Sequence, residues 1–525
     1  MARWEFAFAL ERQRGVPLFQ QIARAIEADI RRGRLRAGDP LPGTRTLARA
    51  LGVQRLTVVS AFDDLVAEGW LVTHRARGTF VSADLPDPKP RRFAAQKSPA
   101  EMANRVAYDL LPAPTPERPY DVPRGSLLFA PSRADVRLAP SDLIGRAYRR
   151  AIGKRGGALL SYANPEGHPR LRDALATMLA STRGLAATAA NVCVTRGSQM
   201  ALSLIARALI RPGDVVVVEQ LGYGPAWEAF RQAGATVVGV PVDHDGLSID
   251  ALERVIAERD VRAVYVTPHH QFPTTVTLSA GRRLRLLELA RAHRIAIIED
   301  DYDHDFHYDG RPVLPLASVD PAGVVIYVGT LSKVLAPALR VGYVVAPTPL
   351  IERLAAHRSY VDTQGDQVLE YALAELFEEG EIQRYIRRVR REYRARRDTL
   401  VAALRRELGE HVGFDVPAGG IALWVKARKG LDVDAWARSS KAHGAIVVTA
   451  ASYTLDARAQ PFMRLGFASL NSAELEEGVR RLVASLPRER ATTSCELGEL
   501  RPCAQLLSAR AIHRTPCASS HNIRR

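Results

Sequence analysis

Residues 324–345 read VVIYVGTLSKVLAPALRVGYVV, and this segment joins an apolar strand to a candidate reactive lysine. The apolar run ends at Thr330, and Ser332 and Lys333 follow it at once. A lysine at the end of a buried strand can reach the cleft at the carboxyl edge of an α/β sheet, where ligands bind. Burial lowers the pKa of such a lysine and makes its amine nucleophilic. Ser332 and Arg340 can both contact a phosphate, whereas an isolated Ser-Lys pair would indicate only an exposed loop.

Short apolar runs lie on both sides of this segment and are separated by helical segments. Strands that alternate with helices predict a largely parallel sheet. A long arginine-rich helix is predicted over 380–407, and FDVPAGGIALWVKA (414–427) with IVVTAAS (446–452) predicts a smaller α+β lobe. The runs predicted as strands are VVVVE (215–219), TVVGVPV (236–242), AVYVTP (263–268), IAIIED (295–300), VVIYVG (324–329) and VGYVVA (341–346).

The segment IAIIEDDYDHDF (295–306) ends a predicted strand with Asp300, Asp301 and Tyr302. A carboxylate at such a strand end can hold a protonated pyridine nitrogen, and Tyr302 can hydrogen-bond a phenolic oxygen. A metal site or a plain acidic loop is the alternative, because four aspartates within residues 300–305 can also attract a cation.

A phosphate site is predicted where VCVTRGSQMALSLIARAL (192–209) passes from strand into helix through Gly197, Ser198 and Gln199. Backbone N–H groups at a helix start, with the Ser198 hydroxyl, form a cup for a phosphate. Tyr223 follows the next strand and can stack on a flat ring, or simply pack in the core. A lysine, a carboxylate, a phosphate cup and a flat contact are what pyridoxal 5'-phosphate requires, so we expect this cofactor.

The first 83 residues predict a second kind of domain. A helix over 17–33, then LPGTRTLARALG (41–52), VQRLTVVSAFDDLVAEG (53–69) and two short β runs, WLVTH and GTFVS, are the parts of a winged helix-turn-helix. The second helix of such a pair enters the major groove of DNA. A protein–protein module with solvated surface charges is the alternative. The candidate DNA contacts are Arg45, Arg55, Thr57, Arg75, Arg77 and Thr79.

Composition agrees with a multidomain cytoplasmic protein. A chain of 525 residues exceeds one hydrophobic core, and its net charge of +16 favours polyanionic partners. Four cysteines make no disulfide framework, and we expect no signal peptide, no membrane span and no metal site. We expect a DNA-binding domain over 1–83, a proline-rich linker over 84–124, the cofactor domain over 125–486 and a disordered tail over 487–525.

Taken together, residues 15–485 resemble the MocR/GabR family of regulators, which join a GntR-type winged helix to a fold-type I aminotransferase-like domain. The motifs TPHHQFP, IIEDDYDHDF, GRPVLPL and YVGTLSKVLAPALRVGY carry the resemblance. It implies that Lys333 carries pyridoxal phosphate as a Schiff base, that Asp300 holds the pyridinium nitrogen and that Tyr302 lies beside it. It also implies a homodimer. The remaining implied contacts are Gly197, Ser198, Gln199 and Arg340 on the phosphate, Tyr223 on the ring and Arg464 on an amino-acid carboxylate.

The chain departs from the family pattern at several positions. Gln220-Leu221-Gly222-Tyr223 replaces the usual acid-Pro-Gly-Tyr, and Thr275 stands where a glycine is usual after Gln-Phe-Pro. We expect the second change to narrow the backbone beside the cofactor. Gln54, Leu56 and Phe62 differ from the usual serine, asparagine and tyrosine of the DNA-binding domain, which bears on the operator sequence.

Three functions follow as hypotheses. The first is a transcriptional regulator that binds an operator in double-stranded DNA and senses an amine, an amino acid or pyridoxal phosphate itself through Lys333. The second is a working aminotransferase with an appended DNA-binding domain. The third, a scaffold without cofactor, is disfavoured by the presence of both Lys333 and Asp300.

Overall fold

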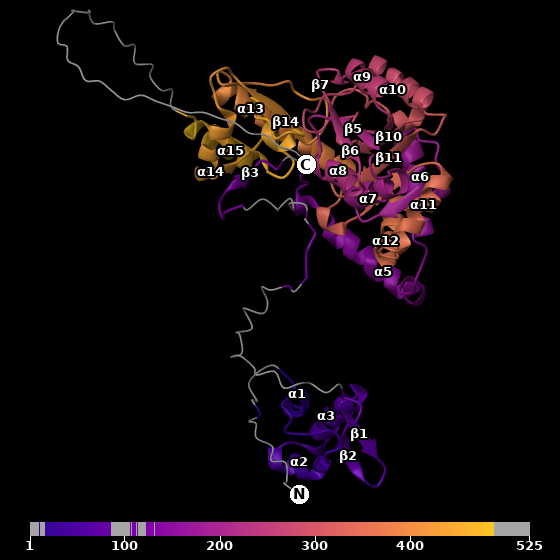
Figure 1. Ribbon diagram of the computed structural model, residues 1–525. Helices are drawn as coiled ribbons and strands as arrows, with labels where there is room; N and C mark the ends of the chain where they lie inside the picture. Colours follow the sequence, from indigo (N-terminus) through magenta and orange to yellow (C-terminus); the bar gives the residue numbers. More distant parts are fainter. Residues whose placement is uncertain are drawn as a thin grey trace, which may run out of the picture. The chain divides into compact units, whose positions relative to one another are not determined.

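The computed structural model describes residues 10, 16–85, 106, 108–111, 113, 122–130 and 132–487. The chain falls into two compact units, residues 1–113 and 114–525 (Figure 1). Most of the predicted linker (84–124) lies outside the described residues, as does the predicted tail (487–525) apart from its first residue. None of the helices in the described part of the chain is long and apolar enough to cross a membrane.

The first unit is the predicted winged helix-turn-helix. It consists of α1 (Leu18–Arg31), α2 (Thr44–Leu51), α3 (Arg55–Ala67) and an antiparallel ribbon of β1 (Leu71–His74) and β2 (Gly78–Val81). Helix α2 stops at Gly52, which adopts the left-handed conformation that only glycine takes without strain. Ile22 and Ile26 of α1 and Val58 of α3 are fully buried between the helices, so a compact core holds the three helices together.

The second unit contains a seven-stranded sheet with the order β4-β12-β11-β10-β9-β5-β6. All neighbouring strands are parallel except β12, which runs antiparallel to both β11 and β4. The predicted, largely parallel sheet is thus confirmed. Its strands are β4 (Val192–Thr195), β5 (Val215–Glu219), β6 (Thr236–Val240), β9 (Val261–Val266), β10 (Ala296–Asp301), β11 (Val325–Thr330) and β12 (Gly342–Val345).

Helices cover both faces of this sheet because its strands are apolar on both sides. Val216 and Val218 of β5 pack on one face with α7, α8 and α11, whereas Val217 packs on the other with α9 and α10. Helices α6, α12 and α13 cover the rest of that second face. The helices are α6 (Pro169–Arg183), α7 (Ser198–Leu209), α8 (Gly224–Gln232), α9 (Ile249–Glu258), α10 (Ala280–His293), α11 (Thr348–Ser359), α12 (Gln367–Glu378) and α13 (Glu381–Leu408).

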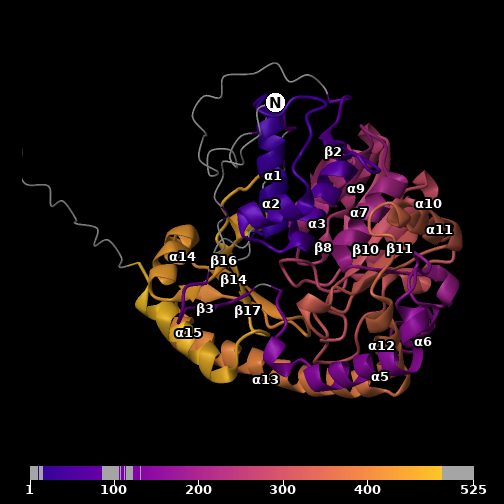
Figure 2. The ribbon, with the colours of Figure 1, turned by 90° about the horizontal axis from the view of Figure 1, so that it is seen from below.

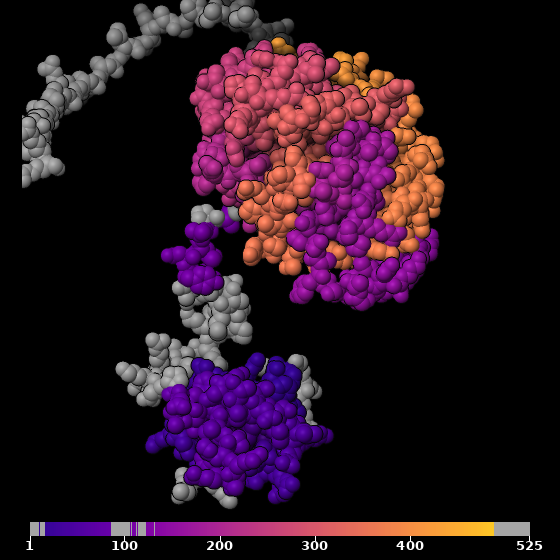
Figure 3. Space-filling model, turned by 90° about the vertical axis from the view of Figure 1, so that its right-hand side faces the viewer, coloured from indigo at the N-terminus to yellow at the C-terminus, as the bar shows by residue number. Residues whose placement is uncertain are grey.

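A smaller lobe follows α13, as predicted. An antiparallel sheet of order β13-β14-β17-β16 packs with α14 and α15, and β15 pairs in parallel with β3 near the start of this unit. Helix α5 (Ser141–Leu159) and α13 run along one border of the unit (Figure 2), and α5 packs on α12. In Figure 3 the purple segment that includes α5 forms part of the surface beside the orange segment.

The elements of the lobe are β3 (Leu127–Leu128), β13 (Val412–Gly413), β14 (Ala422–Ala427), α14 (Val433–Ala442), β15 (Ala445–Ile446), β16 (Val448–Thr449), β17 (Phe462–Gly466) and α15 (Ser472–Ala484). The minor elements are η1 (Val136–Leu138), η2 (Ala189–Asn191), β7 (Val242–Asp243), β8 (Gly246–Leu247), η3 (Leu316–Val319), η4 (Pro337–Leu339) and η5 (Ala450–Tyr453).

Candidate functional site

The predicted cofactor residues come together at one edge of the large sheet. Gly197 follows β4, Tyr223 follows β5, Asp300 ends β10 and Lys333 follows β11. These four strands are parallel, so their carboxyl ends meet at the same edge, where ligands of α/β proteins bind.

Lys333 lies in a protected position. Its Nζ donates a hydrogen bond to Ser132 Oγ at 3.4 Å. Burial lowers the pKa of Lys333 to about 8, although the Asp300 carboxylate opposes this shift by favouring the charged ammonium. At pH 7 roughly a tenth of the amine is therefore neutral and nucleophilic, far more than for an ordinary lysine.

Asp300 is buried, and only one of its two carboxylate oxygens has a hydrogen-bond partner among the described residues. Tyr265 donates its hydroxyl proton to Oδ2 of Asp300 at 2.8 Å, whereas Oδ1 has no hydrogen-bond partner among the described residues. Burial raises the pKa of the Asp300 carboxyl to about 7, with a further upward contribution from Asp301. A buried carboxylate oxygen without a partner is costly, so Oδ1 is suited to a cationic donor that is absent from the chain itself.

The predicted phosphate contacts form a cup at the start of α7. Gly197 is the N-cap of this helix at φ +77°, and no side chain in the described part of the chain caps the helix. Arg340 donates from Nη2 to the carbonyl of Arg196 at 2.9 Å, which holds its guanidinium over Gly197. Ser332 Oγ is buried and lacks a partner among the described residues. The uncapped N–H groups, the guanidinium and the hydroxyl can together bind an anion.

Gln199 has a mainly structural contact. Its Nε2 donates to the carbonyl of Pro225 at 2.9 Å, which ties the start of α7 to the start of α8. Its Oε1 is buried and has no hydrogen-bond partner in the described residues. Ser198 is the first residue of α7, as the sequence predicts.

An aromatic group surrounds Phe272 next to this cup. Tyr223 and Tyr302 both meet Phe272 edge to face, with ring centroids 5.8 and 5.9 Å away. Tyr302 donates its hydroxyl proton to the His270 carbonyl at 2.9 Å. In this arrangement the Tyr302 hydroxyl is hydrogen-bonded to the backbone of the loop that follows β9.

Arg464 of β17 is fully buried beside these rings. It donates to the Pro273 carbonyl, lies 3.5 Å from the Tyr302 hydroxyl and places its guanidinium 4.8 Å from the Phe272 ring centroid. The small lobe thus contributes a positive charge to the same edge of the sheet as Lys333 and Asp300.

The departures from the family pattern have local structural consequences. Thr275 adopts φ +66°, a left-handed conformation that strains a β-branched residue and suits the usual glycine. Gly222, which is retained, has no room for a side chain, because a Cβ would lie 2.9 Å from the Trp227 ring.

Sequence reasoning missed two residues that contact the predicted ones, Tyr265 and Ser132. Tyr265 lies on β9, the strand beside β10. Its position between Val264 and Val266 in a buried strand was the available signal that its side chain lies inside the protein. Ser132 is distant from Lys333 in sequence, and no motif marks it. Sequence reasoning also missed three histidines, His269, His270 and His307, each of which places one ring nitrogen within 4.8 Å of the others.

In the winged unit, the helix predicted to enter DNA begins at Arg55, with Gln54 as its N-cap. Arg55 donates from Nε to Thr44 Oγ1 at 3.3 Å, so the start of α3 lies against the start of α2, where Arg45 is exposed. Leu56, a departure from the family pattern, is 74% exposed, and an exposed leucine at this position can contact a thymine methyl group.

The wing is a tight turn between β1 and β2. Arg75 and Arg77 are exposed there, and Thr79 Oγ1 lies 3.2 Å from Thr73 Oγ1 across the ribbon. Thr57 is half-buried in the first turn of α3. The arginines therefore present two positive charges at the tip of the ribbon.

Comparison with known proteins agrees with this geometry in both units. Residues 139–482 match the family Aminotransferase class I and II, and residues 18–81 match the bacterial regulatory proteins of the gntR family. The chain is 31% identical to the probable rhizopine catabolism regulatory protein MocR of Rhizobium meliloti, over 92% of this chain and 99% of that protein. It is 32% identical to the pyridoxine biosynthesis transcriptional regulator PdxR of Corynebacterium glutamicum, over 72% of this chain and 77% of that protein.

Among solved structures, the α-aminoadipate aminotransferase LysN of Thermus thermophilus superposes with a TM-score of 0.64 at 29% identity. The match covers 69% of this chain and 92% of that one, and that crystal contains N-(5'-phosphopyridoxyl)-L-leucine. A protein with this fold therefore holds a pyridoxal phosphate derivative.

Proposed function

The chain belongs to the MocR-type regulators, which join a gntR-type winged helix to a class I and II aminotransferase domain, and we propose that it senses an amine or amino acid through pyridoxal phosphate held at Lys333. The protein is a transcriptional regulator whose family implies this cofactor. The observation that carries the proposal is the unpartnered Asp300 Oδ1 on the strand next to Lys333.

The residues present fit this cofactor at each of its polar groups. Asp300 Oδ1 would accept from the pyridine nitrogen, and Lys333 would hold the carbonyl carbon. Ser198, Ser332, Arg340 and the start of α7 would hold the phosphate, with Gln199 supporting that helix and Gly197 leaving room for it. Tyr223 would stack on the ring, and Tyr302 would lie beside it. When bound, pyridoxal phosphate supplies an electrophilic carbon that reacts reversibly with primary amines.

The chain's own residues give a reason for selectivity. The fully buried Arg464 can offer a bidentate fork to a carboxylate, so amino acids are favoured over simple amines. Because the pKa of Lys333 is lowered, an incoming amine can displace its amino group near neutral pH. Because Arg464 stands on β17 of the small lobe and donates to the Pro273 carbonyl, a ligand that binds both residues would change how this lobe packs against the large sheet.

DNA binding would use the winged helix, over the proposed domain 1–83. Arg55, Thr57 and Leu56 would face base edges in the major groove, Arg45 would contact a phosphate, and the wing residues Arg75, Arg77 and Thr79 would lie near the backbone or minor groove. The proposed linker over 84–124 would join this domain to the cofactor domain over 125–486. We also propose a homodimer, in which two winged helices read a repeated operator.

The experiment begins with purified full-length protein loaded with pyridoxal phosphate. A visible absorbance band is expected, and borohydride should remove it while attaching the cofactor covalently to Lys333. The Lys333→Ala variant should lack both the band and the attachment. The matched control is Lys441→Ala, an exposed lysine of α14. Amino acids that change this band should also change binding to the DNA upstream of neighbouring genes. If no visible band forms in the wild-type protein, the proposal fails.

Two alternatives have a specific basis and distinct outcomes. The first is an active aminotransferase, because all the candidate cofactor residues are present. Such an enzyme would release a keto acid steadily when it is supplied with an amino donor. The relative PdxR is named for pyridoxine biosynthesis, so pyridoxal phosphate itself is a second candidate effector. In that case the cofactor alone, without amino acid, would change operator binding.

A further inference from the structure

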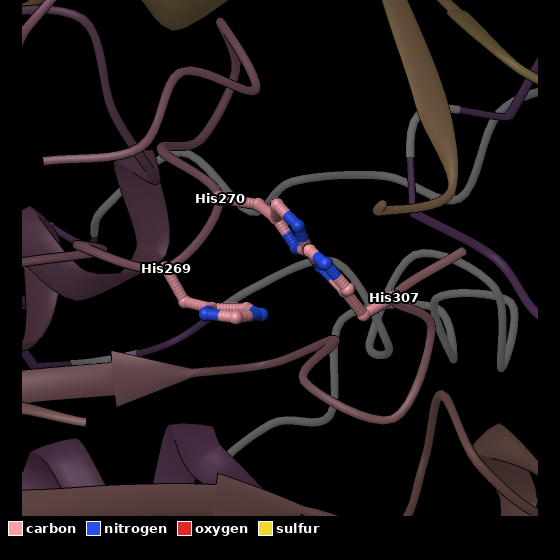
Figure 4. A group of neighbouring side chains, drawn as sticks. All are labelled: His269, His270 and His307. Carbon is pink, nitrogen blue, oxygen red and sulfur yellow. The ribbon is translucent and has the colours of Figure 1, made fainter. Parts of the chain in front are cut away.

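Four histidine rings gather in the loops that follow β9 and β10, next to Tyr302. His269 lies 4.2 Å from His270 and 4.5 Å from His304 between ring centroids, and His307 lies 6.0 Å from His269. Figure 4 shows the rings of His270 and His307 directed toward each other, with the ring of His269 beside them. His269, His270 and His304 are buried and His307 is half-buried.

Most of these ring nitrogens are unsatisfied. Both nitrogens of His269 and of His307 lack a hydrogen-bond partner among the described residues, although these atoms are inaccessible to solvent. Buried polar atoms without partners are rare in folded proteins, and a bound ion can satisfy them. Among the acidic residues of the same segment, Asp301 and Asp305 lie against the buried Arg183, whereas the carboxylate of Asp303 lies directly on His270 and favours a cation beside the rings.

His270 already has the arrangement of a metal ligand. Its Nδ1 lies 2.8 Å from Asp303 Oδ1, so the carboxylate can hold the ring with Nε2 directed away from Asp303. Histidines that bind metals usually donate their second nitrogen to a carboxylate in this way. Gly419 lies next to this nitrogen. A Cβ added to Gly419 would come within 2.6 Å of His270 Nε2.

We propose that His269, His270 and His307 bind one divalent transition-metal ion, zinc being the best match to three imidazole ligands. One nitrogen from each ring lies within 4.8 Å of the others. Zinc bonds of about 2.0–2.1 Å would bring tetrahedral ligand nitrogens to roughly 3.4 Å, so small side-chain rotations must close the group. A water molecule or His304 would complete the coordination.

One of the three histidines borders a cavity, and the group is connected to the cofactor residues. His307 lines a cavity of about 270 Å³ together with His304, Asp305 and residues of α6 and α13. On the other side, the carbonyl of His270 accepts the Tyr302 hydroxyl, and His307 bridges to Gly419. A bound metal would therefore fix the loops after β9 and β10 to each other beside Asp300.

The test is metal binding to the full-length holoprotein, freed of metal by a chelator in phosphate-free buffer. Zn²⁺ is titrated against a chromophoric chelator, and Co²⁺ is used as a probe of geometry. The variants are His269→Asn and His307→Asn, with Asp303→Asn for the supporting carboxylate. The control is His357→Asn, an exposed histidine of α11. Circular dichroism and the cofactor band confirm folding.

We expect one tight equivalent of Zn²⁺ and a tetrahedral Co²⁺ spectrum in the wild type and the control. Each ligand variant should lose roughly tenfold or more in affinity, and Asp303→Asn about 10- to 100-fold. The half-buried His307 provides the decisive variant if His269→Asn does not fold. Absence of a saturable equivalent in the wild type, or equal affinity in His307→Asn and His357→Asn, would overturn the proposal.

Discussion

The guanidinium of Arg340 lies directly over Gly197. A Cβ placed on this glycine would come within 2.9 Å of Nη2 and 3.1 Å of the central guanidinium carbon. Gly197 also has φ +77°, a conformation that disfavours every residue with a side chain. The positive group can therefore lie against the start of α7 only while residue 197 remains a glycine.

Gly197→Ala should weaken the binding of pyridoxal phosphate by about tenfold or more, because the methyl group displaces the Arg340 guanidinium and strains the helix start by roughly 1–3 kcal/mol. The measurement is an absorbance titration of the apoprotein. Gly213→Ala is the matched control, since Gly213 also has a positive φ but nothing lies within 4 Å of its added Cβ. Equal losses in both variants would mean that backbone strain alone is responsible.

Asp300→Asn should lower the affinity for the cofactor by about 10- to 100-fold, because it replaces a charge-assisted hydrogen bond with a neutral one. Tyr265→Phe removes only the hydroxyl that positions this carboxylate at 2.8 Å. It should cost less affinity than Asp300→Asn and should shift the visible band of the bound cofactor. An unchanged affinity in Asp300→Asn would show that the cofactor nitrogen lies elsewhere.

The rate at which apoprotein takes up the cofactor should rise with pH between about 7 and 9. Burial lowers the pKa of Lys333 to about 8, so its reactive neutral amine becomes more abundant as pH increases through that value. The Asp300 carboxylate holds this pKa up, so Asp300→Asn should move the profile toward lower pH. Stopped-flow absorbance measures the rate, and a profile that stays flat over this range contradicts the assignment of Lys333.

In the winged helix, Arg55→Ala should weaken operator binding by about 1–3 kcal/mol and relax the sequence preference at one base pair. Arg77→Ala on the wing should weaken binding about equally for all sequences and reduce the salt dependence by roughly one counterion. Fluorescence anisotropy at several salt concentrations distinguishes the two effects. Arg24→Ala, an exposed arginine of α1, is the control and should leave both quantities unchanged.

Sequence alone predicted those parts of the protein that local patterns encode. Alternating helices and valine-rich runs indicated the sheet, and Asp300 and Lys333 could be located because each ends or follows such a run. The carboxyl ends of parallel strands meet, so their convergence followed from topology.

Contacts that depend on tertiary packing could not be read in the same way. Ser132 reaches Lys333 from 201 residues away, and Tyr265 reads as a core residue until its hydroxyl is seen on Asp300. The histidines come from two loops that meet only in the folded chain, which is why the sequence predicted no metal site there. Thr275 was expected to narrow the backbone, and the structure shows that it instead adopts a left-handed conformation.

Sensing through Lys333 is tested by the operator affinity of the holoprotein with and without the amino acid that changes its visible band, in wild type and in Lys333→Ala. Affinity for DNA in the wild type should change by about 5- to 150-fold on adding the amino acid, the usual range of coupling between two sites. The same addition should leave the affinity of Lys333→Ala unchanged. An unchanged affinity in the wild type, or an equal change in both proteins, would contradict sensing through Lys333.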